Sequence, residues 1–466
     1  MLAARPTIFA LSSGRLPCAI AVIRISGPNA RVALERLTGR VPSPRVATLA
    51  RVRDPSDGSV IDEGLALWFP GPKSESGEDV AELQVHGGRA VVAAVLNALG
   101  KLEGFRHAEA GEFTRRAFEN GRLDLTAVEG LADLVAAETE AQRRQALRQM
   151  QGEFARRLEH WRGQLIEARA LLEAGIDFSD EGDVPGNLAA RAVAILRPVA
   201  QEIGDARRGR GERLRDGLQV VIAGAPNVGK STLLNRLAHR DVAIVSPSAG
   251  TTRDVIEVHL DLGGYPVTLR DTAGIRPTAD AIEQEGVRRA EHWAAASDLV
   301  LWVLDASAIE PAGIDAAAGS LKAYGRPGWL VLNKCDLVDA DVLVNANVAQ
   351  RNEQTFISCD LPYFMISAAG GQGVDGLIAT IADFAAQAFG GEPGLVTRER
   401  HRQMMGDAAH ALGEAIILAD RQGAEGREEL IAEQARLATR ALERLLGRVD
   451  VEEVLDVIFR DFCIGK

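Results

Sequence analysis

Apolar residues in the first 120 positions occur in short runs, and polar turn sequences separate these runs from one another. Strand-like runs cover residues 19–25, 64–69 and 80–85. Between them, residues 30–37 and 90–99 are predicted to be helical. Because strands and helices alternate over this region, we predict an α+β domain over residues 1–120.

The pattern changes after residue 123, where a long amphipathic helix is predicted. Apolar residues follow steps of three and four on a charged background at Leu147, Met150, Phe154, Leu158, Trp161, Leu165, Ala168 and Leu172. A stripe of this kind buries itself against other helices or against a partner. We interpret it as the core of a helical bundle whose first part spans residues 121–215.

Residues 216–384 show a third pattern, in which apolar runs alternate with helical segments. The first run, residues 218–223, begins a series typical of βαβ units and of a mostly parallel sheet. A glycine-rich linker at 390–394 follows, and the chain is then helical nearly to its end. We therefore predict an α/β domain inserted into an all-α domain formed by residues 121–215 and 385–466.

The sequence Gly-Ala-Pro-Asn-Val-Gly-Lys-Ser, residues 224–231, follows the predicted strand 218–223 and opens a helix. It matches the phosphate-binding P-loop, in which backbone N–H groups and the helix N-terminus surround phosphate oxygens. Lys230 is predicted to reach the β and γ phosphates, and Ser231 to bind Mg²⁺. Further predicted nucleotide contacts are Asn227, Val228, Gly229 and Thr232.

Two later motifs indicate GTP as the nucleotide. Asp271-Thr272-Ala273-Gly274 follows a strand, and it places the Asp271 carboxylate in the second shell of Mg²⁺ and the Gly274 backbone N–H near the γ phosphate. In Asn333-Lys334-Cys335-Asp336, the Asp336 carboxylate can accept hydrogen bonds from the two N–H edges that guanine offers and adenine lacks. The backbone of Ser367-Ala368-Ala369 is predicted to support the base.

Two further roles, completing the Mg²⁺ shell and orienting the attacking water, require residues between or after these motifs. Thr252 is the candidate whose hydroxyl completes the Mg²⁺ shell when the γ phosphate is present. Ile275 stands where Ras-like enzymes carry a glutamine that orients the attacking water. The polar groups available instead are Glu283, Glu285 and Asn227.

Composition limits the classes of function. The 466 residues carry 65 acidic and 53 basic side chains, a net charge of −12, so the chain does not coat nucleic acid by charge alone. A local basic run fits either a solvated helix end or a tRNA contact; it comprises Arg207, Arg208, Arg210, Arg213 and Arg215. Four scattered cysteines and the lack of a bilayer-length apolar run predict a soluble cytoplasmic protein without a membrane contact.

Taken together, the motifs resemble one family in particular, the MnmE (TrmE) family of tRNA uridine-34 modification GTPases. The resemblance covers residues 7–466. The stretches that carry it are 224–231, Ala-Gly-Thr-Thr-Arg-Asp at 249–254, 271–274, Ala-Val-Ile-Arg-Ile-Ser-Gly at 21–27, 77–84, His-Gly-Gly at 86–88, Gly-Glu-Phe-Thr at 111–114 and Phe-Cys-Ile-Gly-Lys at 462–466. Residues 13–19 depart from the glycine-richer form of many members.

The resemblance implies a fold and a set of ligands. It implies a homodimer whose N-terminal domain binds 5-formyltetrahydrofolate through Arg24, Glu82, Arg122 and Lys466. It implies that K⁺ is held by Asn227, Ser246, Ser248 and Thr251, of which Ser246 and Thr251 also contact GTP. Glu283 matches the water-positioning glutamate of the family, so Glu283 and Lys230 are the catalytic candidates.

The resemblance also implies an activity and a partner. With the flavoprotein MnmG (GidA), in a heterotetramer, the family adds an aminomethyl or carboxymethylaminomethyl group at carbon 5 of the wobble uridine, with the folate as one-carbon donor. An alternative remains open at this stage. The same GTPase motifs also occur in Era-like regulators, which bind RNA or ribosomes without modifying them.

Overall fold

A computed structural model describes residues 5–177, 187–209, 211–240, 242–244, 257–271, 297–308, 311–338, 361–390, 394–422, 426–449, 455, 458–460, 462 and 464–465. The chain forms two compact units. The first contains residues 1–132, 147–204 and 403–466, and the second contains residues 133–146 and 205–402. The predicted fold class is confirmed, whereas the predicted domain boundaries remain predictions.

The N-terminal part of the first unit is an α+β layer. Its described strands are β1 (Thr7–Leu11), β2 (Cys18–Ser26), β3 (Thr48–Arg53), β4 (Val60–Phe69), β5 (Val80–Gly87) and β6 (Phe105–His107), and its helices are α1 (Ala30–Thr38), α2 (Arg89–Gly100) and α3 (Glu112–Glu119). The sheet order is β3-β4-β5-β2-β1-β6, antiparallel except for the β1–β6 pair. Strand alternation buries Ala21, Ile23 and Ile25 in the core that includes α1 and α2.

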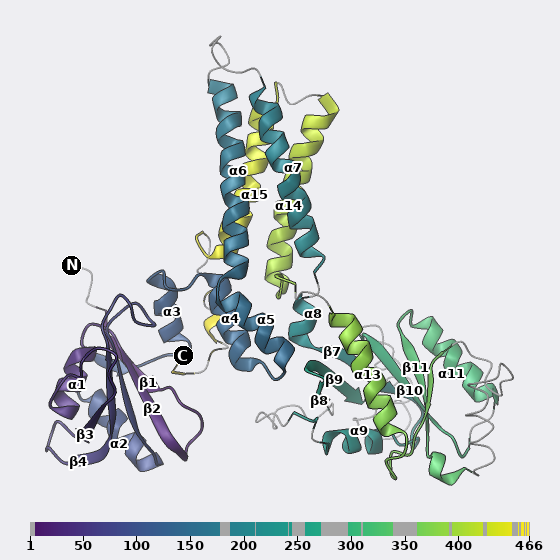
Figure 1. The fold of residues 1–466 in the computed structure, drawn as a ribbon, viewed down its shortest axis with the longest axis horizontal. Helices are drawn as coiled ribbons and strands as arrows, with labels where there is room; N and C mark the ends of the chain where they lie inside the picture. The colour runs from purple at the N-terminus through teal and green to yellow at the C-terminus, as the bar shows by residue number, and fades with distance from the viewer. Residues whose placement is uncertain are drawn as a thin grey trace, which may run out of the picture. The chain divides into compact units, whose positions relative to one another are not determined.

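Long helices form the rest of the first unit and run side by side in its bundle (Figure 1). The helices are α4 (Leu125–Ala136), α6 (Glu153–Asp177), α7 (Leu188–Arg207), α14 (Glu399–Gln422) and α15 (Glu428–Leu446), together with the end of α5 (Glu140–Met150), whose residues 140–146 belong to the second unit. Helix α6 packs against α15, so segments on either side of the inserted region share one bundle. A hydrogen bond from Trp161 Nε1 to Glu202, 3.0 Å long, links α6 to α7.

The predicted apolar stripe has one interruption. A single helix over 147–172 is wrong, because α5 ends at Met150 and α6 begins at Glu153. Gly152 between them has φ of 76°, a left-handed conformation that stops a helix and favours glycine. From Phe154 to Leu172 the stripe is fully buried, so its interpretation as bundle core is confirmed.

The second unit contains a mostly parallel sheet covered by helices. Its described strands are β7 (Leu218–Ala223), β8 (Glu257–Leu262), β9 (Tyr265–Asp271), β10 (Leu299–Asp305), β11 (Gly328–Asn333) and β12 (Tyr363–Met365), and its helices are α8 (Gly211–Asp216), α9 (Lys230–Ala238), α11 (Pro311–Ala323), the 3₁₀ helix η1 (Cys335–Leu337) and α13 (Val374–Phe389). The order is β12-β11-β10-β7-β9-β8, and β8 alone pairs antiparallel. The carboxyl ends of β7, β9, β10 and β11 therefore share one edge, where the loops that bear the motifs begin.

Within the residues that the structure describes, no helix is long and apolar enough to cross a bilayer.

Candidate functional site

The P-loop connects β7 to α9, as the sequence predicted, and two of its glycines are dictated by close contacts. At Gly224, φ is 141° and an added Cβ would lie 2.3 Å from the carbonyl oxygen of Val303. At Gly229, φ is 97° and a Cβ would lie 2.2 Å from the Asn333 side chain. Any larger residue at either position would displace the neighbouring strand or the asparagine.

Lys230 lies over the P-loop. Its Nζ donates hydrogen bonds of 2.8 Å to the carbonyl oxygens of Gly224 and Ala225. Burial lowers the pKa of Lys230, and the nearby Asp271 carboxylate partly opposes this effect. The loop thus holds the ammonium group in place with two exchangeable hydrogen bonds, which a phosphate oxygen can replace.

Ser231 and Asp271 form the candidate Mg²⁺ site. Asp271 ends β9, is 3% exposed, and accepts a 2.9 Å hydrogen bond from Ser231 Oγ. A hydroxyl and a carboxylate at this distance are the oxygen donors that Mg²⁺ prefers, and phosphate oxygens and water usually complete its shell. The residues present therefore fit the ion.

The side chain of Asn333 joins three of the predicted motifs. Its Nδ2 donates to the carbonyl oxygen of Val228 in the P-loop, and its Oδ1 accepts from the backbone N–H of Ala368, both at 2.8 Å. Asn333 is 2% exposed. One buried amide thus fixes the distance between the phosphate-binding loop and the two loops predicted to hold the base.

On the side of the site predicted to hold the base, the Asp336 side chain is exposed on η1. Lys334 has φ of 65°, and its Nζ lies 2.5 Å from Asp305 Oδ2. Burial raises the pKa of Asp305, but hydrogen bonds from Lys334 and Ser307 outweigh it and leave this pKa below its ordinary value. The pair anchors Lys334 to the end of β10 and leaves Asp336 directed to solvent.

Two participants in this region were missed from the sequence. Arg236 on α9 donates hydrogen bonds to the carbonyl oxygens of Ala368 and Ala369, and so ties the third motif to the helix that follows the P-loop. Asp305 carried a usable signal, because it is a polar residue at the carboxyl end of a parallel strand next to β7 and β11. Arg236 carried none, because its partners lie more than 130 residues away.

The remaining predicted site residues fall in two groups, those in the described P-loop and those outside the described residues. Asn227 lies exposed in the P-loop with φ of 62°, and Val228 is buried while Thr232 is exposed. Outside the described residues lie Ser246, Ser248, Thr251, Thr252, Thr272, Ala273, Gly274, Glu283 and Lys466.

Three arginines of the predicted basic run have acidic partners, and Arg210 lies outside the described residues. Arg208 contacts Asp205, Arg213 contacts Asp298, and Arg215 contacts Asp216. Both interpretations of the run, a solvated helix end and a tRNA contact, remain predictions.

Two predicted folate contacts lie side by side on the N-terminal sheet. Arg24 on β2 and Glu82 on β5 are cross-strand partners, and their side chains form a 3.1 Å ion pair. Arg24 also contacts Glu75 at 2.6 Å and lies 5.9 Å from the centre of the Phe113 ring. Both side chains are less than one fifth exposed. The geometry offers a cation, a carboxylate and an aromatic face to a planar ligand.

The other two folate candidates approach from different segments. Arg122 is exposed beyond α3, and its stem packs next to Gly77. Lys466 itself is not described, but Gly465 is buried against β1, where Ser12 Oγ donates a 2.8 Å hydrogen bond to its carbonyl oxygen. A Cβ at Gly465 would lie 2.2 Å from the Leu11 carbonyl oxygen. The C-terminal segment therefore lies beside the strand that pairs with the strand of Arg24.

A buried arginine, Arg116, pairs with one glutamate from each of two motif stretches, residues 77–84 and 111–114. Arg116 on α3 is fully buried and contacts Glu78 and Glu112, both at 2.9 Å. Glu112 also pairs with Arg106, whose hydrogen bonds help to lower the pKa of Glu112 although burial alone would raise it. The glutamates of Gly77-Glu78 and Gly111-Glu112 thus support the domain from within, a role that the sequence did not indicate.

Comparisons with known proteins agree with this geometry. The model of the MnmE helical domain matches residues 125–463, and that of the GTP-binding protein TrmE N-terminus matches residues 7–122. The tRNA modification GTPase MnmE of Rhodopseudomonas palustris (strain BisB18) is 56% identical over 463 residues, 99% of each chain. That of Parvibaculum lavamentivorans is 53% identical over 471 residues, 99% of this chain and 100% of its own. The chain belongs to the MnmE (TrmE) family.

Proposed function

We propose that this protein is the GTP-hydrolysing subunit of the enzyme that modifies carbon 5 of the wobble uridine (U34) in tRNA. The observation that carries the proposal is the joining of three nucleotide motifs by Asn333, in a chain whose relatives are tRNA modification GTPases over 99% of its length. The Era-like alternative is not favoured, because the match to the TrmE N-terminus lies outside the GTPase region.

In this assignment, each motif residue has a distinct task. Lys230 exchanges its loop carbonyls for the β and γ phosphates, and Ser231, with Thr252, supplies oxygen ligands to Mg²⁺, which neutralises phosphate charge when bound. Asp336 reads the N–H edge of guanine, and the Ser367–Ala369 loop, held by Asn333 and Arg236, supports the base.

The proposal includes a monovalent cation and a water-orienting residue. Asn227 sits exposed at the P-loop, and with Ser246, Ser248 and Thr251 it would form a K⁺ site of neutral oxygens. A cation there supplies the positive charge that an arginine finger supplies in other GTPases. Glu283 would orient the attacking water, a task for which Ile275 has no polar group.

The folate proposal rests on the N-terminal sheet. Arg24, with Arg122 and Lys466, supplies cations, and Glu82 accepts from the N–H groups of the pterin ring of 5-formyltetrahydrofolate. The Arg24–Glu82 ion pair keeps both groups oriented in the absence of the ligand. The bound folate provides the one-carbon unit for the uridine.

The partners belong to the proposal as well. The sheet face opposite α1 and α2 exposes Ile20, Leu49 and Leu65, an apolar surface suited to a second copy of the chain. The flavoprotein MnmG would join this homodimer in a heterotetramer that acts on tRNA. Sedimentation velocity of the full chain tests the dimer, and a monomer at micromolar concentration would contradict it.

Replacing Asp336→Asn is expected to weaken GTP binding about 100-fold and to shift the preference toward xanthosine triphosphate. Two hydrogen bonds to a charged acceptor contribute about 3 kcal/mol together, and the amide restores complementarity only to xanthine. Fluorescence titration with labelled nucleotides measures both affinities. Asp315→Asn, an exposed aspartate on α11, is the matched control; unchanged GTP selectivity in Asp336→Asn would remove guanine recognition from this residue.

GTP hydrolysis is expected to be at least about tenfold faster in K⁺ than in Na⁺ at equal ionic strength, because charge supplied next to the phosphates lowers the barrier. Asn227→Ala should remove most of this difference, whereas Asn235→Ala, at an exposed position on α9, should retain it. Single-turnover phosphate release gives the rates. Equal rates in the two salts for the unaltered protein would refute the K⁺ site.

Glu82→Gln is expected to weaken 5-formyltetrahydrofolate binding about tenfold or more, since it removes the charged acceptor for the pterin N–H groups. Glu63→Gln is the matched control, because Glu63 forms a comparable cross-strand ion pair with Arg51 at 3.0 Å on the same sheet. Isothermal titration calorimetry measures the affinities. If the two variants bind the folate equally, the assignment of Glu82 fails.

A further inference from the structure

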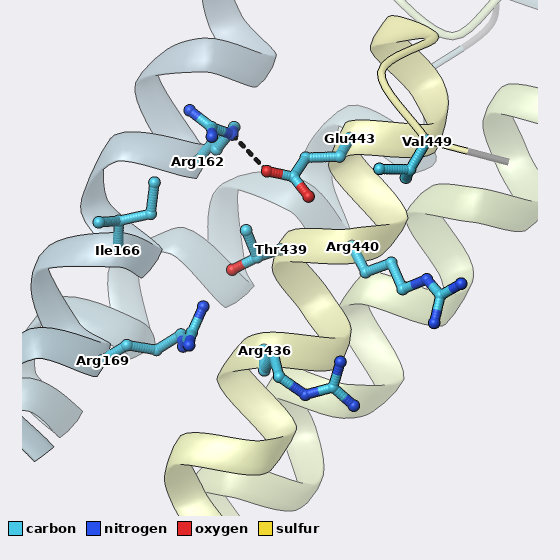
Figure 2. Close-up of a pocket in the computed structure, with 8 residues that line it drawn as sticks. All are labelled: Arg162, Ile166, Arg169, Arg436, Thr439, Arg440, Glu443 and Val449. Atoms are coloured by element: carbon cyan, nitrogen blue, oxygen red, sulfur yellow. Dashed lines mark hydrogen bonds and ion pairs between the residues drawn. The ribbon is translucent and has the colours of Figure 1, made fainter. Parts of the chain in front are cut away.

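A cleft lined by arginines lies between α6 and α15, in the bundle of the first unit (Figure 2). It holds about 510 Å³, and its charged lining residues are Arg162, Arg169, Arg436, Arg440 and Glu443. Four arginines and one glutamate give this lining a formal charge of +3. Neither the nucleotide motifs nor the folate residues contribute to it.

One ion pair across the cleft fixes its shape. Arg162 on α6 donates from Nε to Glu443 on α15 at 2.8 Å, and both side chains are about one quarter exposed. Because the two residues come from different helices, the pair holds α6 against α15 at this level. Arg162 and Glu443 are therefore structural residues of the cleft rather than its ligands.

Arg169 and Arg436 each pair with a glutamate of their own helix. Arg169 points toward α15 in Figure 2 and contacts Glu173 of its own helix at 3.1 Å through Nη2. Arg436 pairs with Glu433 one turn away at 2.7 Å, and both are nearly half exposed. Exposed pairs within one helix contribute only about 0.3–0.5 kcal/mol, so a phosphate can compete with them.

The spacing of the arginines favours an extended polyanion. Arg436 and Arg440 extend in the same direction from successive turns of α15 (Figure 2), about 6 Å apart along the helix axis. Arg444 lies one further four-residue step along α15, whereas Arg448 lies beyond Gly447, which ends the helix, and pairs with Glu159. A lone phosphate would contact one or two of these groups, whereas a phosphodiester chain presents a charge at every nucleotide.

We propose that this cleft binds the phosphate backbone of the tRNA substrate. The inference rests on the proposed function, which makes tRNA the polyanion that the protein must hold. The planar guanidinium group matches phosphate oxygens in pairs, and such contacts position RNA without reading its sequence. A chain with a net charge of −12 needs a local surface of this kind to approach RNA.

The test removes the two exposed arginines of α15 from the full-length protein. Arg436→Gln/Arg440→Gln should weaken binding of fluorescently labelled tRNA about tenfold and reduce the slope of log affinity against log salt by about 1 to 2. Arg436→Lys/Arg440→Lys should recover most of the slope, because the charge remains. GTP hydrolysis without tRNA should be unchanged in both variants, which also shows that they fold.

The matched control is Arg191→Gln/Arg421→Gln, which removes two exposed arginines from α7 and α14, outside the cleft lining, and changes the net charge equally. It should leave tRNA binding within about twofold of the unaltered protein. An equal loss in this control would mean that net charge, not the cleft, sets the affinity, and would overturn the proposal.

Other outcomes also separate the alternatives. Unchanged tRNA affinity and salt slope in the α15 variant, with the unaltered protein binding tRNA, would overturn the cleft and leave the proposed function standing. If the α15 variant binds tRNA normally but no longer binds tripolyphosphate, the cleft is a site for a small anion instead. If the variant binds tRNA normally but no longer binds the flavoprotein, the cleft is a protein contact. An unaltered protein that binds no tRNA, alone or with the flavoprotein, would count against the proposed function itself.

Discussion

The two hydrogen bonds of the Asn333 side chain determine how the nucleotide site is assembled. Nδ2 holds the P-loop through the Val228 carbonyl, and Oδ1 holds the base-side loop through the Ala368 N–H. At 2% exposure, water cannot replace either bond. Loss of the amide would strand a buried donor and a buried acceptor, each at a cost of about 1–3 kcal/mol. Because Asn333 ends β11, the position of this strand in the sheet fixes the positions of the two loops that the amide holds.

In the first unit, ion pairs between side chains hold separate segments together, as the Asn333 hydrogen bonds do in the second unit. Arg116 is fully buried, and Glu78 and Glu112 compensate its charge, so that removing one partner would leave an uncompensated charge inside the domain. Arg24 and Glu82 form a similar but partly exposed pair on neighbouring strands. The exposed pair can exchange partners with a ligand, whereas the buried pair cannot. Burial therefore separates the supporting arginine from the proposed binding arginine.

The elements that the sequence predicted correctly are those marked by a pattern within a short stretch of the chain. The strand 218–223 and the P-loop were placed correctly because a continuous apolar run and the glycine spacing are both local. The break between α5 and α6 was missed because the three- and four-residue spacing continues across Gly152. Local sequence holds no record of contacts such as Arg236 with Ala368, or of the convergence of Arg169 and Arg436 on one cleft. Those depend on packing between segments far apart in the chain.

The central claim is that GTP bound at the Asn333-centred site serves the modification of the wobble uridine. Mass spectrometry of wobble nucleosides from tRNA tests it most directly, in cells that lack the gene and carry either the unaltered chain or Asn333→Ala. The account predicts that the unaltered chain restores the modified nucleoside and that Asn333→Ala does not, although the purified variant still binds 5-formyltetrahydrofolate. Full restoration by Asn333→Ala, or an unchanged nucleoside in cells without the gene, would contradict it.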